Sequence, residues 1–168
     1  MYHFVTHWRV RATAQEVFDV LADPFGLKRW WPSVYLDVKE LDPGDPTTHE
    51  GRLVGLHTKG WLPYTLKWQF TVPRSNPPHG FELIAMGDFM GIGVWTLTQD
   101  GAFVHVTYDW QVAVRKPLIR YLSPLFRPVF SANHRWAMAR GLESLELELR
   151  RRRGESVPAP PGPTFARH

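Results

Sequence analysis

The chain has 168 residues, enough for one domain with a hydrophobic core and too few for two domains of ordinary size. It contains no cysteine, which excludes disulfides, thiolate catalysis and cysteine-based zinc sites. The formal charge is +4, but four arginines form one run at 150–153, so the sequence gives little support for nucleic-acid binding. The favoured interpretation of this run is a solubilising helix end that opposes the helix dipole.

The first residues alternate in polarity. Tyr2, Phe4, Trp8 and Val10 fall on one side, which predicts a strand over about residues 2–11 with one buried face. This start does not resemble a signal peptide, and no apolar run approaches the roughly 20 residues that cross a bilayer. We therefore expect a cytoplasmic protein without an integral membrane segment, and a transient contact with a membrane surface stays open.

Two short helices are predicted after this strand. Thr13 and Glu16 have the spacing of a capping box, and an apolar side follows them up to Leu21. Asp23-Pro24 ends that helix. Residues 25–31 form the second one, which stops at Pro32 because the residue before a proline avoids the helical region.

Six further strands are predicted between residues 34 and 114, separated by turn residues. Short turns favour an antiparallel meander. In the last strand the valines, Tyr108 and Trp110 share one face, whereas His105 and Asp109 share the other, so the sheet has one wet side. Gly91 and Gly93 are interpreted as a bend. The predicted strands are 34–41, 52–59, 64–72, 81–89, 94–99 and 104–114.

A long amphipathic helix is predicted over residues 127–153, after a connector at 116–126. Pro128 suits its first turn and Gly154 its carboxyl-terminal cap. Glu146 with Arg150, and Glu148 with Arg152, have the favourable i,i+4 order. The apolar face comprises Phe130, His134, Ala137, Met138, Gly141, Leu142, Leu145 and Leu149.

This order predicts an α+β domain at 1–153, in which a curved antiparallel seven-stranded sheet wraps its dry concave face around the long helix. Gly141 has no side chain and Ala137 only a small one, so they leave space beside the helix and we expect a pocket opposite them. Residues 154–168 are rich in proline and poor in apolar surface, and are predicted to be a flexible tail.

The element order and several local patterns resemble the START-like, helix-grip (SRPBCC) superfamily, and within it the polyketide cyclase/dehydrase and lipid-transport branch, over about residues 1–150. The resemblance implies a helix-grip fold. It implies no catalytic residue set, because this superfamily includes carriers of hydrophobic ligands as well as aromatase/cyclases. The patterns are Glu16-Val17-Phe18, Trp30-Trp31-Pro32, Leu62-Pro63-Tyr64, Gly87-Asp88 and residues 133–142 of the last helix.

The candidate ligand-binding residues are polar or aromatic groups expected near the concave face. His134 could donate a hydrogen bond or move a proton, but a core histidine is the favoured interpretation. Asp88 could mark the pocket mouth, although an aspartate beside a glycine more often binds turn N–H groups. Core packing is the alternative for the aromatic residues. The full set is Asp88, Trp95, Tyr108, Trp110, His134, Met138 and Gly141.

No metal or cofactor is expected, since the histidines form no H-E-x-x-H or H-x-H pattern and no phosphate-binding glycine motif occurs. The first functional hypothesis is a protein that binds or carries a small hydrophobic molecule, such as a lipid, isoprenoid or polyketide-like compound. The alternative is a cyclase or dehydratase in which His134 and Tyr108 transfer protons. A third is a protein-interaction module that docks through its tail or arginine run. The sequence sets no oligomeric state.

Overall fold

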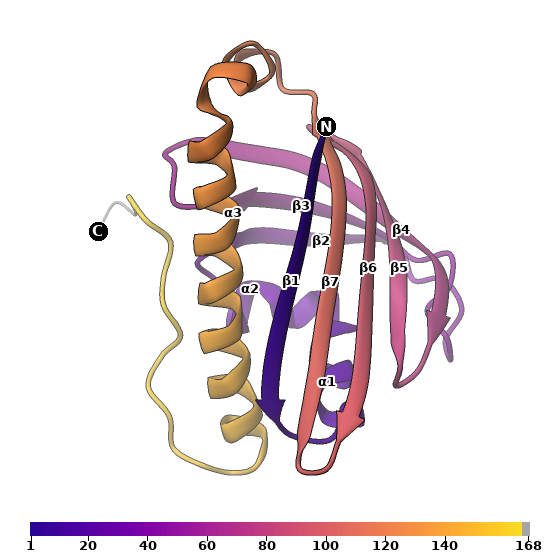
Figure 1. Ribbon diagram of the computed structural model, residues 1–168. Helices are drawn as coiled ribbons and strands as arrows, with labels where there is room; N and C mark the ends of the chain where they lie inside the picture. The colour runs from indigo at the N-terminus through magenta and orange to yellow at the C-terminus, as the bar shows by residue number, and fades with distance from the viewer. Residues whose placement is uncertain (166–168) are drawn as a thin grey trace.

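The computed structural model describes residues 1–165 and shows one antiparallel sheet of seven strands wrapped around a long helix (Figure 1). The strand order is β1-β7-β6-β5-β4-β3-β2. The α+β helix-grip architecture predicted above is therefore confirmed. The elements are β1 (Tyr2–Arg11), α1 (Ala14–Leu21), a 3-10 turn (Pro24–Gly26), α2 (Leu27–Trp30), β2 (Tyr35–Asp42), β3 (Leu53–Lys59), β4 (Thr65–Asn76), β5 (Gly80–Gly87), β6 (Phe89–Asp100), β7 (Phe103–Val114) and α3 (Pro117–Arg152).

The start of the chain folds as its local sequence predicts. Strand β1 buries Tyr2, Trp8 and Val10 on one face. The capping box at the start of α1 is present, because the Thr13 hydroxyl accepts a hydrogen bond from the Glu16 N–H at 3.2 Å and the Glu16 carboxylate accepts one from the Thr13 N–H at 3.0 Å. Two otherwise unsatisfied N–H groups are thereby paired, and the chain turns from the sheet into the helices.

The predicted bend at Gly91 and Gly93 is wrong, because both residues lie inside one continuous strand, β6. Glycine is needed at these positions because neighbouring atoms come very close to the backbone, and not because the chain turns there. A Cβ on Gly91 would lie 1.9 Å from the carbonyl oxygen of Gln111, and one on Gly93 would lie 2.9 Å from the Tyr108 hydroxyl. The absence of a side chain is thus required by the paired strand and by the rings that lie on it.

Helix α3 begins at Pro117, within the segment predicted as a connector. It has a kink at Phe126, whose φ and ψ are not helical, between Pro124 and Pro128. A proline removes one helical hydrogen bond and its ring collides with the preceding turn, so the two prolines account for the kink. The predicted start near 127 therefore corresponds to the kink and not to the first turn.

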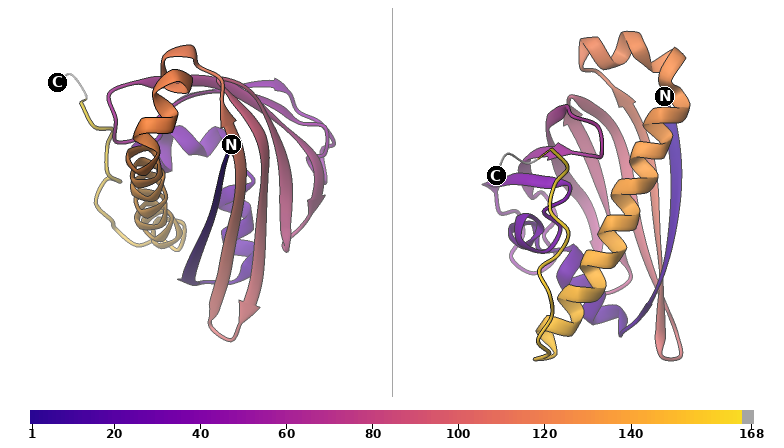
Figure 2. Two further views of the ribbon diagram at one scale, coloured as in Figure 1. Left: turned by 45° about the horizontal axis from the view of Figure 1, so that its top comes forward. Right: turned by 90° about the vertical axis from the view of Figure 1, so that its left-hand side faces the viewer.

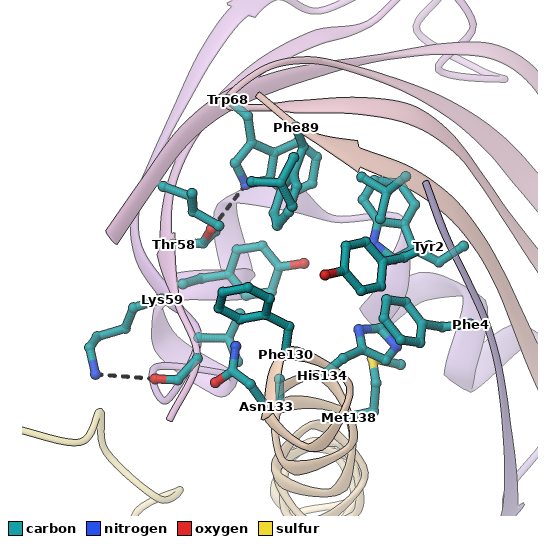
Figure 3. Close-up of a pocket in the computed structure, with 18 of the residues that line it drawn as sticks. Tyr2, Phe4, Thr58, Lys59, Trp68, Phe89, Phe130, Asn133, His134 and Met138 are labelled. Carbon is teal, nitrogen blue, oxygen red and sulfur yellow. Dashed lines mark hydrogen bonds between the residues drawn. The ribbon is translucent and has the colours of Figure 1, made fainter. Parts of the chain in front are cut away.

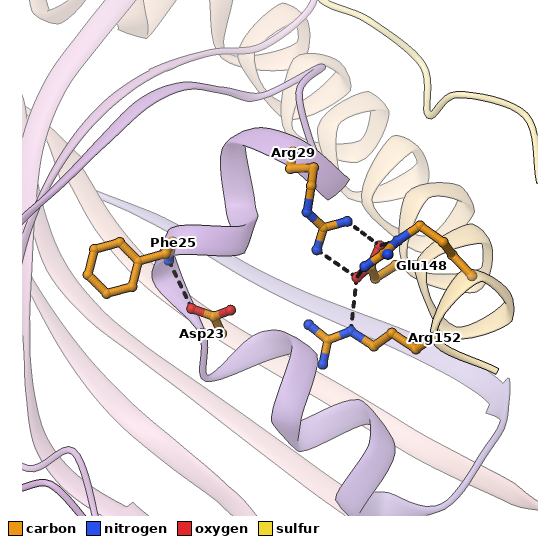
Figure 4. A network of polar contacts seen from close by, with 6 residues as sticks. Asp23, Phe25, Arg29, Glu148 and Arg152 are labelled. Carbon is orange, nitrogen blue, oxygen red and sulfur yellow. Dashed lines mark hydrogen bonds and ion pairs between the residues drawn. The ribbon is translucent and has the colours of Figure 1, made fainter. Parts of the chain in front are cut away.

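The carboxyl-terminal part of α3 is fixed to α2 through a buried carboxylate. The Glu148 side chain is 2% exposed and receives two hydrogen bonds of 2.8 Å from the Arg29 guanidinium, and others from Arg151 and Arg152 (Figure 4). The predicted Glu148 and Arg152 pair is confirmed. Arg150 lies 3.5 Å from Glu155, instead of pairing with Glu146 as predicted.

Helix α3 ends at Arg152, and Gly154, whose φ is +86°, lies just beyond it in the left-handed conformation of the cap that the sequence predicted. The following residues run back along the helix toward the β3–β4 loop, as Figures 1 and 2 show. There, the Lys59 ammonium group donates a hydrogen bond of 2.9 Å to the Thr164 carbonyl. The flexibility of this tail stays a prediction, and its residues 166–168 lie outside the described part. No helix within residues 1–165 is long and apolar enough to span a membrane.

Candidate functional site

A cavity of about 130 Å³ lies between the concave face of the sheet and the middle of α3 (Figure 3). It lies beside the kinked part of α3, because Ile119 and Phe130 both belong to its wall. About half of the residues in its wall are aromatic. Rings come from the sheet, from the end of the α2 segment and from α3, and they include Tyr2, Phe4, Trp31, Tyr35, Trp68, Phe89 and Phe130.

The floor of the cavity is a stack of three rings on neighbouring strands. The Trp95 and Tyr108 rings are 4.1 Å apart and nearly parallel, and Tyr108 stacks in turn on Trp110 at 5.7 Å. Trp95 lies directly opposite Tyr108 in the register of β6 and β7, and Gly93 lies opposite Trp110. Because Gly93 has no side chain, the Tyr108 and Trp110 rings have room to lie against the strand at this position.

The helix side of the cavity is formed by one face of α3. Phe130, Asn133, His134, Ala137 and Met138 line it, at the i, i+3, i+4, i+7 and i+8 spacing of a single helical stripe. Except for Asn133, these residues belong to the apolar face that the sequence predicted. In the structure it is a core face that borders a cavity.

His134 is the polar group on the helix side that the sequence singled out. Its ring stacks on Phe4 with centroids 4.1 Å apart, and its Nε2 atom is buried and has no hydrogen-bond partner among the described residues. Burial lowers the pKa of the imidazole to about 4, because the charged form is the one that desolvation disfavours. The ring is therefore neutral at pH 7.

The other polar groups of the cavity are also uncharged, with one exception at the rim. Burial raises the pKa of Tyr64 to about 12 and raises those of Tyr35 and Tyr108 as well, so these hydroxyls stay protonated. None of the described residues that line the cavity is an aspartate or a glutamate. The exception is Lys59.

Lys59 and Gly60 form a rim that the tail covers. The Lys59 ammonium group binds the carbonyl oxygens of Gly60 at 3.1 Å and of Thr164 at 2.9 Å, and it lies 5.5 Å from the centre of the Phe165 ring. Asn133 on α3 accepts a hydrogen bond from the Leu62 N–H at 3.2 Å, which fixes the β3–β4 loop to the helix. Burial lowers the pKa of Lys59.

Five of the seven candidate residues lie around this one cavity: Trp95, Tyr108, Trp110, His134 and Met138. Their part in binding stays a prediction. Asp88 does not border the cavity; its carboxylate accepts a hydrogen bond of 2.8 Å from the N–H of Lys67, which lies in strand β4 and not in a turn.

The pocket was expected opposite Ala137 and Gly141; the cavity borders Ala137 but does not reach Gly141. A Cβ on Gly141 would lie 2.3 Å from the Trp31 ring, so this glycine allows close helix packing, and the cavity lies one turn earlier at Ala137 and His134. No local pattern signals this contact, because Trp31 belongs to a distant segment. Phe4 and Phe130 were found as core residues, and only the fold shows that they border a cavity.

The comparisons with known proteins agree with this architecture. A family model described as "Polyketide cyclase / dehydrase and lipid transport" matches residues 1–150. No curated protein matches the chain. Among solved structures, a protein from Thermus thermophilus is similar with a TM-score of 0.68 and 16% identity, over 92% of this chain and 100% of its own. The Zhui aromatase/cyclase from Streptomyces sp. R1128 is similar with a TM-score of 0.67 and 18% identity, over 90% of this chain and 94% of its own. At these identities the structural matches establish the fold alone.

Proposed function

The chain belongs to the polyketide cyclase/dehydrase and lipid-transport family, and on this premise we propose that it binds and carries a small, uncharged hydrophobic molecule in the cavity between the sheet and α3. One observation carries the proposal. The wall of the cavity is made of aromatic rings, aliphatic side chains and neutral polar groups, with Lys59 at the rim as its one charged group and no carboxylate among its described residues.

This wall favours an apolar ligand for two physical reasons. Each Å² of apolar surface removed from water contributes about 25 cal/mol, so affinity does not require charged groups. The aromatic rings of the wall also suit offset or edge-to-face contacts with a planar or polyunsaturated ligand. The unpartnered Nε2 atom of neutral His134 would accept or donate one hydrogen bond, depending on its tautomer, and would orient a ligand hydroxyl or carbonyl.

A matched pair of substitutions on α3 tests the proposal. Ala137 borders the cavity, whereas Ala139, on the same helix, is exposed. Ala137→Leu should weaken the binding of an apolar fluorescent dye at least tenfold, because it fills the cavity, and Ala139→Leu should leave the binding unchanged. Native mass spectrometry of protein purified from its own host should in addition show a retained hydrophobic molecule. Equal dye affinities in the two variants would contradict the proposal.

A second candidate function is a cyclase or dehydratase reaction in which His134 and Tyr108 transfer protons. The observation that favours it is that both side chains border the same cavity, with a buried imidazole nitrogen free to accept a proton. The test is turnover of poly-β-keto thioester mimics. The enzyme hypothesis would replace the carrier hypothesis if the wild type showed turnover and His134→Gln lowered it about a hundredfold at unchanged dye affinity. His105→Gln, at an exposed position, is the control and should keep the turnover of the wild type.

A further inference from the structure

The first part of α3 carries an apolar stripe that faces solvent. Leu118, Tyr121, Leu122 and Leu125 have the i, i+3, i+4, i+7 spacing of one helical face, and are 69%, 83%, 41% and 77% exposed. Phe126 and Val129 extend the exposed apolar surface past the kink. Single exposed apolar residues are common on proteins, but a continuous stripe of this kind marks an interaction surface. We call residues 117–129 the docking segment.

The docking segment is fixed to the body by its opposite face, so the stripe is not exposed by fraying of the helix. Ile119 is 4% exposed and borders the cavity. The Tyr2 hydroxyl is hydrogen-bonded to the Ser123 hydroxyl, and Arg127 donates a hydrogen bond of 3.0 Å to the Met1 carbonyl. The Lys116 ammonium group binds the Thr65 carbonyl at 2.6 Å.

The kink at Phe126 sets residues 117–125 of the docking segment apart from the rest of α3. In Figures 1 and 2 this part forms the end of the molecule at which the amino terminus lies, beyond the rim of the sheet. The stripe therefore projects from one end of the protein, and the cavity wall at Ile119 lies directly behind it.

The charged residues of the sequence around this stripe have one sign. Residues 110–142 contain no aspartate or glutamate and six basic residues: Arg115, Lys116, Arg120, Arg127, Arg135 and Arg140. Arg115, Arg120 and Arg127 are exposed within or beside the docking segment. The whole chain, by contrast, contains 20 Lys and Arg residues and 16 Asp and Glu residues. Exposed leucines and a tyrosine on a helical segment whose only charged residues are basic are complementary to a surface with apolar depth and anionic headgroups.

We propose that the docking segment binds the surface of a bilayer that contains anionic lipids. The stripe of Leu118, Tyr121, Leu122 and Leu125 enters the boundary between headgroups and acyl chains, and the exposed Arg115 and Arg120 contact lipid phosphates and carboxylates. This orientation brings the Ile119 side of the cavity to the membrane. The inference goes beyond ligand binding, since it concerns where the protein docks.

Flotation with lipid vesicles tests the inference. The wild-type chain should float with vesicles of phosphatidylcholine and phosphatidylserine, bind vesicles of phosphatidylcholine alone about tenfold or more weakly, and be released by salt. The double variant Leu118→Gln, Leu125→Gln should lose at least tenfold in partition, and Arg120→Gln about fivefold. The matched control is Val5→Gln with Ile92→Gln, which replaces exposed apolar residues on the opposite, convex face of the sheet and should change nothing.

Three outcomes would overturn the inference: no flotation of the wild-type chain with anionic vesicles at low salt, an equal loss in the convex-face control, or a wild-type dimer that Leu118→Gln, Leu125→Gln converts to a monomer. The last would assign the stripe to an interface between copies of the chain. Dye binding measured without vesicles tests the ligand proposal independently of membrane docking. The double variant should keep wild-type dye affinity, because neither leucine borders the cavity.

Discussion

Gly141 lies directly against the ring of Trp31, so closely that a Cβ at this position would come within 2.3 Å of the Trp31 Cζ2 atom. On the other side Trp31 borders the cavity, and it packs edge-on against Tyr35 at 5.2 Å. The glycine therefore sets how far the Trp31 ring stands from the cavity.

Gly141→Ala should destabilise the protein by about 1 to 3 kcal/mol, the usual effect of forcing a methyl group into a packed core. The sign of the change in unfolding free energy is informative, since a glycine-to-alanine change inside a helix otherwise stabilises a protein by about 1 kcal/mol. Denaturant unfolding measures the change. The paired variant Trp31→Leu, Gly141→Ala should recover stability relative to the sum of the single changes. A simple stabilisation by Gly141→Ala would show that the helix can move away from the ring.

His134 makes the stability of the protein depend on pH. Its pKa is lowered by burial from an ordinary 6.5 to about 4, so between these values the unfolded chain binds a proton that the folded chain does not. The stabilising contribution is complete above pH 6.5 and is lost as the pH falls toward 4, by about 3 kcal/mol.

Unfolding by denaturant at several pH values between 4.5 and 7 checks this prediction. His134→Gln should flatten the slope of stability against pH. The slope that remains in this variant is the baseline for the comparison. Part of it comes from His49, because burial also lowers the pKa of this residue, so that it too destabilises the fold as the pH falls. An unchanged slope in His134→Gln would mean that the imidazole is hydrated in solution.

Patterns within single elements could be predicted from the sequence. Strand β1 and the capping box at Thr13 depend on neighbours a few residues apart, and alternation placed Tyr108 and Trp110 on the dry face of β7. His134 could be singled out because an imidazole on an apolar helical face is unusual. These inferences needed no knowledge of what lies opposite.

Features that depend on distant segments could not be predicted. Gly141 was interpreted as a vacancy because nothing in the sequence shows that Trp31 fills the space above it. Gly93 was interpreted as a bend although it makes room for the Tyr108 ring. The helical start at Pro117 was missed because Pro124 and Pro128 indicate helix breaking, whereas in the fold they produce only a kink.

Glu148 should be more important for stability than its place in a charged run suggests. Burial raises the pKa of its carboxyl, but hydrogen bonds from Arg29, Arg151 and Arg152 outweigh this and lower the pKa well below its ordinary 4.5. Glu148→Gln should lose about 2 to 3 kcal/mol, since charge-assisted hydrogen bonds are replaced by neutral ones.

The matched control for this change is Glu143→Gln, on the same helix, whose carboxylate pairs with Arg140 at 2.7 Å but is half exposed. Its loss should stay below about 1 kcal/mol. Because the folded pKa of Glu148 is lowered, its contribution is present above about pH 4.5 and is lost as the pH falls below that value. Equal losses of stability in the two variants would show that the Glu148 cluster contributes no more than a surface ion pair.

The contact between the tail and the rim should control how fast a ligand leaves. Thr164 donates a hydrogen bond of 2.9 Å to the Trp61 carbonyl and receives one from Lys59, which borders the cavity. Thr164→Val keeps the shape of the side chain but removes its hydroxyl, so it should speed dye dissociation by roughly three- to tenfold, the equivalent of about 0.5 to 1.5 kcal/mol for one hydrogen bond. Thr164→Ser, which keeps the hydroxyl, should behave as the wild type.

Deletion of residues 155–168 should raise the dissociation rate further and lower the melting temperature only slightly, because the tail buries little apolar surface. Stopped-flow dilution of the dye-loaded protein measures the rates. Identical rates in the wild type and the deletion variant would show that the ligand leaves elsewhere, and the Ile119 side of the cavity, behind the docking segment, would then be the exit to test.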